Sequence, residues 1–274
     1  MPVSATARVH PTALISAEAT IGDQVEIGAF SVIEGPVTLG PDCAIATHVR
    51  LIGPLVMGRG NTVGSGSVFG DFPQHGGYRG EPTGTEIGDF NTFREHVTVH
   101  RGSHVAGAGS TRIGNHNYFM VNSHVAHDAL VANQCIIANG ALIAGHCEIQ
   151  DRVFMSGNSA LHQFVRMGRL SLLSGCEGAS QDIIPFVVAE NRNRVSGVNV
   201  IGLKRAGMPA ADIAAARKAF TILYRSNLIF KLATDRLREE MGAVPVVAEI
   251  LAFIASSRRG IIRAVTERDD DGWG

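Results

Sequence analysis

The stretch from Ile113 to Leu173 reads IGNHNYFMVNSHVAHDALVANQCIIANGALIAGHCEIQDRVFMSGNSALHQFVRMGRLSLL, with a large apolar residue at every sixth position. The same frame runs from Val3 to Phe69 and again over residues 87–99. A period of six matches neither the turn of an α-helix nor the alternation of a strand. A short fixed repeat is typical of a solenoid, and hexapeptide repeats build a parallel β-helix. The sequence therefore predicts a mainly β protein with a parallel β-helix over residues 1–190.

Each hexad is expected to supply one short strand and one turn, so that three hexads close a triangular coil of about 18 residues. Glycine often follows the apolar residue of a hexad, and we interpret that slot as a corner where the backbone adopts a positive φ. Such glycines are Gly22, Gly28, Gly40, Gly58, Gly64, Gly88, Gly114 and Gly168.

Three of the four cysteines share one slot of the hexad. Cys43, Cys135 and Cys147 each stand four residues after the apolar residue, where other hexads carry Ala or Ser. A free cysteine behaves as a small hydrophobe in such a position. We therefore expect buried core cysteines rather than disulfides or metal ligands.

Two polar, glycine-rich stretches, 71–86 and 101–112, leave the frame before it resumes. Insertions in solenoids tend to emerge on one face and to carry binding function, although neutral surface loops are the alternative. The repeat decays after Leu173. Residues 191–274 are predicted to form a connecting segment and a small helical domain that covers the end of the solenoid. Helical spacing favours helices over residues 210–226, 228–242 and 245–260, and the acidic tail 269–274 is expected to be disordered.

The composition narrows the class of protein. The formal net charge of the 274 residues is −1, so the chain lacks the basic field expected of a nucleic-acid-binding protein. No apolar run approaches the length of a transmembrane helix. The first residues, MPVSA, show none of the features of a signal peptide, and a cytoplasmic protein is the expectation.

Histidines gather in the later repeats. Residues one coil apart differ by 18 positions and stack at the strand spacing of about 4.8 Å. That arithmetic predicts one patch on a single edge, made of His127, Asp128, Gly145, His146, His162 and Gln163.

This patch holds the parts of an acyl-transfer site. An imidazole beside a carboxylate can take a proton from an attacking hydroxyl, and an exposed backbone amide can stabilise an oxyanion. No serine or cysteine is an obvious nucleophile, which favours direct transfer. Two other classes stay open: a zinc enzyme of the γ-carbonic-anhydrase type, whose ligand spacing the His124–His127 gap does not match, and a non-catalytic hexapeptide-repeat scaffold.

The motifs NSHVAHD (122–128), IAGH (143–146) and HQF (162–164) resemble those of the UDP-N-acetylglucosamine O-acyltransferases, the enzymes that begin lipid A synthesis. Further matching motifs are VTVHRG (97–102), GEPT (80–83), GVN (197–199), GLKR (202–205) and LYRS (223–226). The resemblance covers nearly the whole chain except the last dozen residues. It implies a left-handed β-helix, a homotrimer with active sites between subunits, and no metal or organic cofactor.

The resemblance also implies roles for individual residues. His127 is the expected general base, Asp128 orients it, and Gly145 offers the oxyanion-hole amide. The donor is expected to be a (3R)-hydroxyacyl chain on acyl carrier protein, and the acceptor the 3-hydroxyl of UDP-N-acetylglucosamine. The expected substrate-binding residues are His100, His124, His146, His162, Gln163 and Gln74, with Asn199 and Arg205 for the nucleotide and Leu172 and Gly175 for the acyl-chain ruler.

Because acyl carrier protein is acidic, a local basic surface is expected, with an ordinary solvated helix face as the alternative. The candidates are Arg192, Arg194, Lys204, Arg205, Arg217, Lys218 and Arg225.

The chain departs from the family pattern at four positions. His75 and Gly77 stand where well-known members carry Asp and Lys. Ile201 stands where an acidic residue is usual, and Ala206 replaces a second Arg. These departures lie on the acceptor side, so the alternative is a paralogue that acylates a different UDP-amino sugar, on oxygen or on nitrogen.

Overall fold

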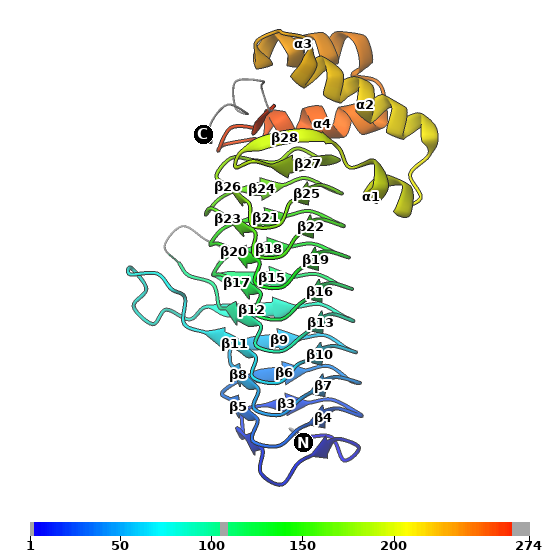
Figure 1. The fold of residues 1–274 in the computed structure, drawn as a ribbon. Coiled ribbons are helices and arrows are strands. Elements are labelled where there is room, and N and C mark those ends of the chain that lie inside the picture. The colour runs from blue at the N-terminus through cyan, green and yellow to red at the C-terminus, as the bar shows by residue number, and fades with distance from the viewer. Residues whose placement is uncertain (1–2, 105–108, 265–274) are drawn as a thin grey trace, which may run out of the picture.

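The computed structural model describes residues 3–104 and 109–264, and the expectation for the acidic tail falls outside them. Over these residues the chain winds into a three-sided β-helix with helices at its C-terminal end (Figure 1). Three sheets of mainly parallel strands form the sides, which we call the first, second and third face in chain order. In the regular coils, away from the two insertions, strand registers advance by 18 residues, as in Arg8 against Glu26. The predicted coil is confirmed.

The strands on each face are short, mostly of two to four residues. The first face contains β1 Arg8–Val9, β4 Glu26–Ile27, β7 Ala44–Ile45, β10 Thr62–Val63, β13 Thr92–Phe93, β16 Tyr118–Phe119, β19 Ile136–Ile137, β22 Phe154–Met155, β25 Leu172–Leu173, β27 Val187–Glu190, β28 Arg194–Val198 and β29 Arg263–Ala264. The second face contains β2 Leu14–Ile15, β5 Val32–Glu34, β8 Arg50–Ile52, β11 Val68–Asp71, β14 Thr98–His100, β17 His124–Val125, β20 Leu142–Ile143, β23 Ala160–Leu161 and β26 Gly178–Ala179. The third face contains β3 Thr20–Ile21, β6 Val37–Leu39, β9 Leu55–Met57, β12 Gly84–Ile87, β15 Ser110–Ile113, β18 Leu130–Val131, β21 Glu148–Ile149 and β24 Arg166–Met167.

The core is the stack of apolar residues that defined the repeat. Phe69, Phe93 and Phe119 are fully buried, with ring centroids 4.8 Å apart at each step. Phe69 contacts Phe93 edge to face, and Phe93 stacks on Phe119. The slot four residues further on also points inward. Cys43, Cys135 and Cys147 fill it as buried free thiols, and burial raises the pKa of both Cys135 and Cys147 to about 12. The predicted core role of these three cysteines is confirmed.

The prediction of a positive φ at the recurring glycines is wrong. None of the eight has one; the positive φ falls two residues later, for example at Gln24, Phe30 and Asp42. The glycines are needed for close approach between coils instead. A β-carbon at Gly22, for instance, would come within 2.8 Å of the backbone nitrogen of Pro41 in the next coil.

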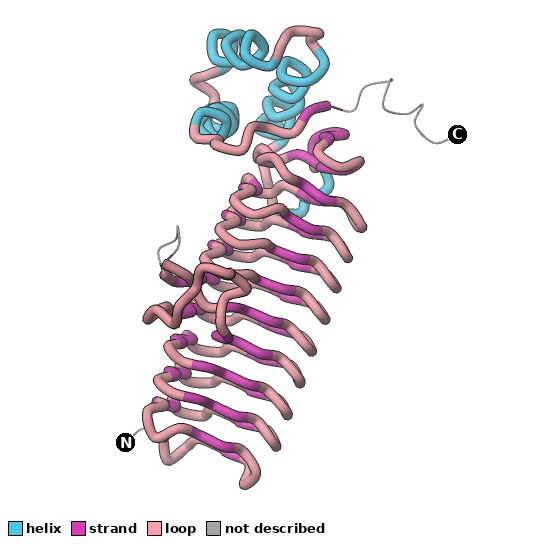
Figure 2. Tube along the Cα trace, turned by 90° about the vertical axis from the view of Figure 1, so that its left-hand side faces the viewer, coloured by secondary structure: helices cyan, strands magenta, loops and turns pink. Residues whose placement is uncertain are grey.

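Both insertions leave the β-helix at the same edge, between the second and third faces (Figure 2). The first loop connects β11 to β12, and the second connects β14 to β15. Residues 105–108 of the second loop lie outside the described part of the chain.

The C-terminal part closes the end of the β-helix. The predicted helices are observed as α2 Ala210–Arg225, α3 Phe230–Met241 and α4 Pro245–Ala255. Helix α4 is tied to the last coils through Arg169, which donates twice to the Glu249 carboxylate at 2.9 and 2.8 Å. No helix among the described residues is long and apolar enough to cross a membrane.

The connecting segment has more structure than expected. It contains β28, which pairs antiparallel with β27, and the short helix α1, Val200–Arg205. The Asn199 side chain caps α1 by accepting from the Gly202 amide at 3.0 Å. The proposed domain boundary after residue 190 falls between β27 and β28, and as a division into domains it stays a prediction.

Candidate active site

The candidate catalytic residues lie in the turn between β17 and β18, on the edge from which both insertions emerge. His127 and Asp128 are 6% and 7% exposed. Asp128 is a corner residue with φ +59°, a conformation that Asp tolerates better than most residues. Its amide donates to Thr111 Oγ1 at 2.8 Å, which ties this corner to the end of the second insertion.

His127 and Asp128 form a hydrogen-bonded dyad. The His127 Nδ1–H donates to Asp128 Oδ2 at 2.9 Å when the imidazole carries its proton there. Ser103 holds the same carboxylate: its amide donates to both oxygens at 3.0 Å and its hydroxyl to Oδ2 at 2.7 Å. Burial acts to raise the pKa of Asp128, but the hydrogen bonds from His127 and Ser103 outweigh it and lower the pKa. Asp128 is therefore a carboxylate at neutral pH, and Nε2 of His127 is left as the basic nitrogen.

Gly145 lies directly beside the His127 ring, one coil further along. A β-carbon at this position would come within 2.7 Å of Cε1 and 2.8 Å of Nε2 of His127. Among the described residues, the Gly145 amide donates to no acceptor. An unpaired N–H close to a basic imidazole is the arrangement that acyl transfer requires.

Two more histidine rings contact His127 edge to face. His146 lies at a centroid distance of 5.0 Å and His75, from the first insertion, at 5.4 Å. His146 also has its Nε2 3.8 Å from Asp128 Oδ2, and its other side stacks on Phe164. Desolvation is the main cause that lowers the pKa of His146. His146 is therefore held largely neutral beside the dyad.

His100 and His124 form a second pair on the second face, with centroids 5.0 Å apart. His124 Nδ1 lies 2.7 Å from Thr98 Oγ1. Desolvation, followed by the repulsion of His100 and His127, lowers the pKa of His124 to about 4. Desolvation also lowers the pKa of His100. Both are neutral hydrogen-bonding groups near pH 7.

The remaining predicted edge residues are more exposed. Gln163 stands above Gly145 in the coil register, and the Phe164 amide donates to the Gly145 carbonyl at 3.0 Å. His162 Nδ1 lies 3.2 Å from a guanidinium nitrogen of Arg259. Gln74 is exposed on the first insertion, next to His75. Among the described residues, no hydrogen bond joins the dyad to His162, Gln163 or Gln74.

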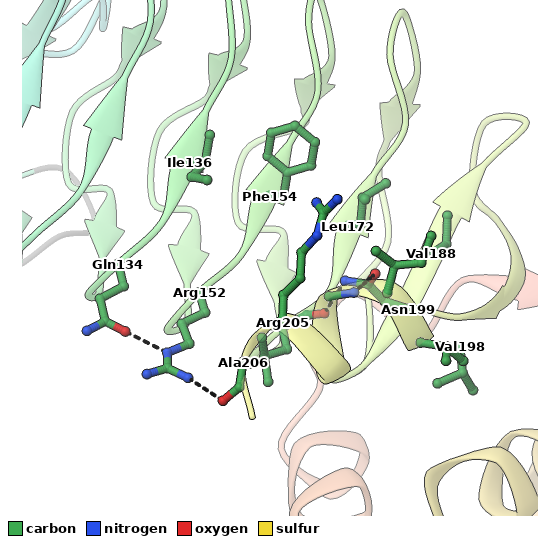
Figure 3. A pocket seen from close by; sticks show the side chains of 14 residues that line it. Gln134, Ile136, Arg152, Phe154, Leu172, Val188, Val198, Asn199, Arg205 and Ala206 are labelled. Atoms are coloured by element: carbon green, nitrogen blue, oxygen red, sulfur yellow. Dashed lines mark hydrogen bonds between the residues drawn. The ribbon is translucent and has the colours of Figure 1, made fainter. Parts of the chain in front are cut away.

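The nucleotide and ruler candidates gather elsewhere, at a cavity of about 920 Å³ on the first face beside α1 (Figure 3). The wall carries Ile136, Phe154, Leu172 and Val188, and Arg205 extends over it from α1. Gly175 does not line this cavity.

Some residues around α1 already have hydrogen-bond partners within the chain. The Asn199 side chain also donates to the Leu170 carbonyl at 2.9 Å, so both ends of its amide are paired. Of the departures noted above, Ile201 is 67% exposed at the cavity, and the Ala206 carbonyl accepts from Arg152 at 3.2 Å.

The cavity and the dyad lie on opposite sides of the prism. The dyad occupies the edge between the second and third faces, and the cavity opens on the first face. Figure 1 shows the insertions and α1 projecting in opposite directions. One chain therefore does not bring His127 and Arg205 to the same place.

A metal ion is a poor fit to the dyad. His127, Asp128 and His146 offer ligand atoms within 4.8 Å of one another. However, Asp128 Oδ2 already accepts from His127 and from Ser103. An ion bound through Oδ2 would compete with these bonds, whereas zinc ligands usually have their second-shell hydrogen bonds in addition to the metal.

Sequence reasoning missed the residues that hold the dyad in place. Ser103, Thr98 and Thr111 are ordinary polar residues in sequence, and Ser103 lies in an irregular insertion to which the 18-residue spacing does not apply. His75 was identified as a departure, but its contact with His127 depends on the path of the first loop. The contact of Phe164 with His146 could have been predicted from the sequence, because Phe164 stands 18 positions after His146.

Comparisons with known proteins agree with this architecture. A family model described as "Udp N-acetylglucosamine O-acyltransferase; Domain 2" matches residues 182–262, and a bacterial transferase hexapeptide model of six repeats matches residues 18–53.

Two curated relatives carry the name acyl-[acyl-carrier-protein]–UDP-N-acetylglucosamine O-acyltransferase. The protein from Anaeromyxobacter sp. (strain Fw109-5) is 44% identical over 214 residues, 78% of this chain and 83% of the relative. The protein from Thermodesulfovibrio yellowstonii is 40% identical over 256 residues, 93% of this chain and 99% of the relative.

Solved structures show the same fold. The UDP-N-acetylglucosamine acyltransferase from Campylobacter jejuni superposes with a TM-score of 0.88 at 32% identity, over 94% of this chain and 100% of that one. The enzyme from Bacteroides fragilis 9343 superposes with a TM-score of 0.85 at 38% identity, over 95% and 100%. The expected left-handed parallel β-helix with C-terminal helices is confirmed. By sequence and by structure, the chain belongs to the UDP-N-acetylglucosamine O-acyltransferase family.

Proposed function

We propose that this protein transfers a (3R)-hydroxyacyl chain from acyl carrier protein to the 3-hydroxyl of UDP-N-acetylglucosamine, the first step of lipid A biosynthesis. Membership of the family supports the reaction. The observation that carries the assignment of residues is the His127–Asp128 dyad beside the unpaired Gly145 amide.

The chemistry follows from these three groups. His127 Nε2 accepts the proton of the sugar hydroxyl as its oxygen attacks the thioester carbon. The carbonyl oxygen becomes an oxyanion, which the Gly145 N–H stabilises. The C–S bond then breaks, and His127 returns the proton to the departing thiolate. Asp128 holds the Nδ1 proton and stabilises the imidazolium in between.

The neutral histidines suit a site that binds an uncharged sugar ring. His100, His124 and His146 each have a lowered pKa, so they offer hydrogen bonds without repelling the imidazolium that forms on His127. We assign them to substrate binding, together with His162, Gln163 and Gln74 on the more exposed part of the edge.

We propose that the working form is a homotrimer with the active site between two copies. The support is the position of the cavity, which opens on the face opposite the dyad. In an assembly around a threefold axis, the first face of one copy can lie against the catalytic edge of the next. Arg205 would then contact the nucleotide, and Leu172, on the apolar wall of the cavity, would limit the length of the acyl chain.

The acyl carrier protein is proposed to approach from the helical end. Arg217, Lys218 and Arg225 are exposed on α2, although Lys218 lies 3.7 Å from Glu240. Arg259 adds a cation on the catalytic edge itself, where it donates to the Ser180 carbonyl at 3.0 Å beside His162. Gly175 as a second ruler residue and a cytoplasmic location remain predictions from the sequence.

A different acceptor is the second candidate, and His75 is the observation that favours it. Its ring contacts the general base, so a change from the family's usual residue alters the immediate surroundings of the acceptor. Transfer to a related UDP-amino sugar, on oxygen or on nitrogen, uses the same dyad.

Purified protein incubated with UDP-N-acetylglucosamine and a panel of hydroxyacyl-carrier-protein thioesters tests the proposal, with products identified by mass spectrometry. A 3-O-acylated product supports it, and the product mass gives the chain length. Turnover only with an amino-sugar nucleotide would favour the second candidate. Zinc in stoichiometric amount after purification without chelators, with activity lost on its removal, would contradict both.

A further inference from the structure

The carboxylate of Asp128 has two histidine neighbours that compete for one oxygen. His127 Nδ1 lies 2.9 Å from Oδ2, and His146 Nε2 lies 3.8 Å from the same atom. A modest rotation of the carboxylate toward His146 would release His127. The imidazole would then lose the partner that keeps its proton on Nδ1 and leaves Nε2 basic.

Ser103 prevents this rotation geometrically. Its amide donates to both carboxylate oxygens at 3.0 Å, which fixes the plane of the group. Its hydroxyl donates to Oδ2 at 2.7 Å, so that oxygen is held between Ser103 and His127. Ser103 itself is fully buried, which keeps water from replacing the contact.

The contact between Ser103 and the Asp128 carboxylate exists because the second insertion places Ser103 at this edge. Ser103 follows β14 at the start of the second loop, and Thr111, which accepts from the Asp128 amide, stands in β15 at its end. The bond to the Asp128 amide has counterparts in plain turns, where the corner amides of Gln24 and Phe30 also donate to a threonine hydroxyl. The bonds to the Asp128 carboxylate, in contrast, come from Ser103 of the insertion. The two stems of the insertion thus hold the side chain and the backbone of one corner residue.

We propose that Ser103 is a positioning residue of the transfer reaction, which acts through Asp128 to keep the carboxylate on His127 rather than on His146. The inference rests on the proposed role of His127 as general base. His75 and His146 are the other titratable groups in ring contact with His127.

The test is a double-mutant cycle on the full-length protein. Ser103→Ala should lower kcat about tenfold, because one hydrogen bond to a charged group is lost while the amide remains, with KM for both substrates changed less than twofold. In an Asp128→Asn background, the same substitution should lower kcat less than twofold, because its target is already altered. A fall of similar size in both backgrounds would overturn the inference.

Ser110→Ala is the matched control. Ser110 is also a buried serine of this insertion, and its hydroxyl also donates to a carboxylate, that of Glu86 at 2.9 Å, away from the dyad. It should keep the wild-type kcat; an equal loss there, or wild-type kcat in Ser103→Ala, would contradict the proposal. Melting temperatures of all variants check folding, and Ser103→Cys, with a weak donor of similar shape, should give an intermediate kcat.

His127→Ala in the same assay distinguishes a failure of the general-base mechanism from a failure of the Ser103 proposal. If it keeps wild-type turnover, the proposed mechanism fails and the role of Ser103 with it. If it loses turnover while the cycle is additive, only the role of Ser103 fails.

Discussion

Gly145 packs against the His127 imidazole so closely that a side chain at position 145 would clash with the ring. A β-carbon on Gly145 would lie 2.7 Å from Cε1 of His127. The base and the oxyanion-stabilising amide of the proposed mechanism therefore come from residues that are one coil apart in register. The spacing of the solenoid, rather than a flexible loop, sets the distance between them.

Gly145→Ala should lower kcat by roughly two orders of magnitude without unfolding the protein, because the methyl group must displace the His127 ring and block the amide. Gly157→Ala is the control: it stands in the same slot of another hexad, where a β-carbon would lie 3.5 Å from the Asn139 carbonyl. Steady-state kinetics of both variants test this. Equal kcat values would contradict the contact.

Protonation of His124 should destabilise the protein as the pH falls. Its pKa is about 4 in the folded state, against about 6.5 when exposed, so the unfolded state binds the extra proton between these values. The stabilising contribution is therefore complete above pH 6.5 and is lost progressively toward pH 4, by about 3 kcal/mol at most. Asp128, whose pKa is lowered, contributes to the pH dependence only below its ordinary value.

Urea unfolding at fixed protein concentration, from pH 7 to pH 4.5, measures this effect. His124→Gln should flatten the dependence, because the amide has no proton to gain in this range. An unchanged slope would show that His124 titrates normally.

The repeat and the edge that carries the dyad could be predicted, because in a β-helix the spacing of two residues in the sequence determines their relative position. A difference of 18 residues between His127 and Gly145 is enough to stack them, and the arithmetic needs no knowledge of side-chain conformation. The core cysteines followed from the same frame. The role of the glycines did not, because spacing alone does not distinguish a positive φ from a close approach of two coils.

Outside the frame, sequence spacing carries no positional information. Ser103 and His75 reach the dyad through loops whose paths depend on tertiary contacts. Helix α1 was missed because six residues are too few for a helical period, although Asn199 is a suitable N-cap. The separation of the cavity from the dyad could not be predicted either, because the family resemblance assigns both sets of residues to the same reaction.

His75 should influence acceptor binding through Nε2. The Gly77 amide donates to its Nδ1 at 3.0 Å, so the neutral ring carries its proton on Nε2. His75→Gln can present an N–H at a similar reach, whereas the shorter His75→Asn cannot. We expect KM for the sugar nucleotide to rise about tenfold in the Asn variant and less in the Gln variant, with KM for the acyl donor unchanged. Equal effects of both variants on the acyl donor would contradict this role.

Two inactive variants should restore activity when mixed. If each active site takes His127 from one copy and Arg205 from the next, co-refolded His127→Ala and Arg205→Ala chains must form some sites with both native residues. A random trimer then gives about a quarter of the wild-type number of sites. Activity no higher than the sum of the two separate variants would place both residues in one chain and contradict the proposed assembly.

The most direct test of the mechanism is the turnover of His127→Ala with hydroxyacyl carrier protein and UDP-N-acetylglucosamine, compared with wild type at saturating substrate. We predict a loss of roughly two to four orders of magnitude in kcat, the contribution typical of a positioned general base. A variant that folds and assembles like the wild type and retains near wild-type turnover would contradict it.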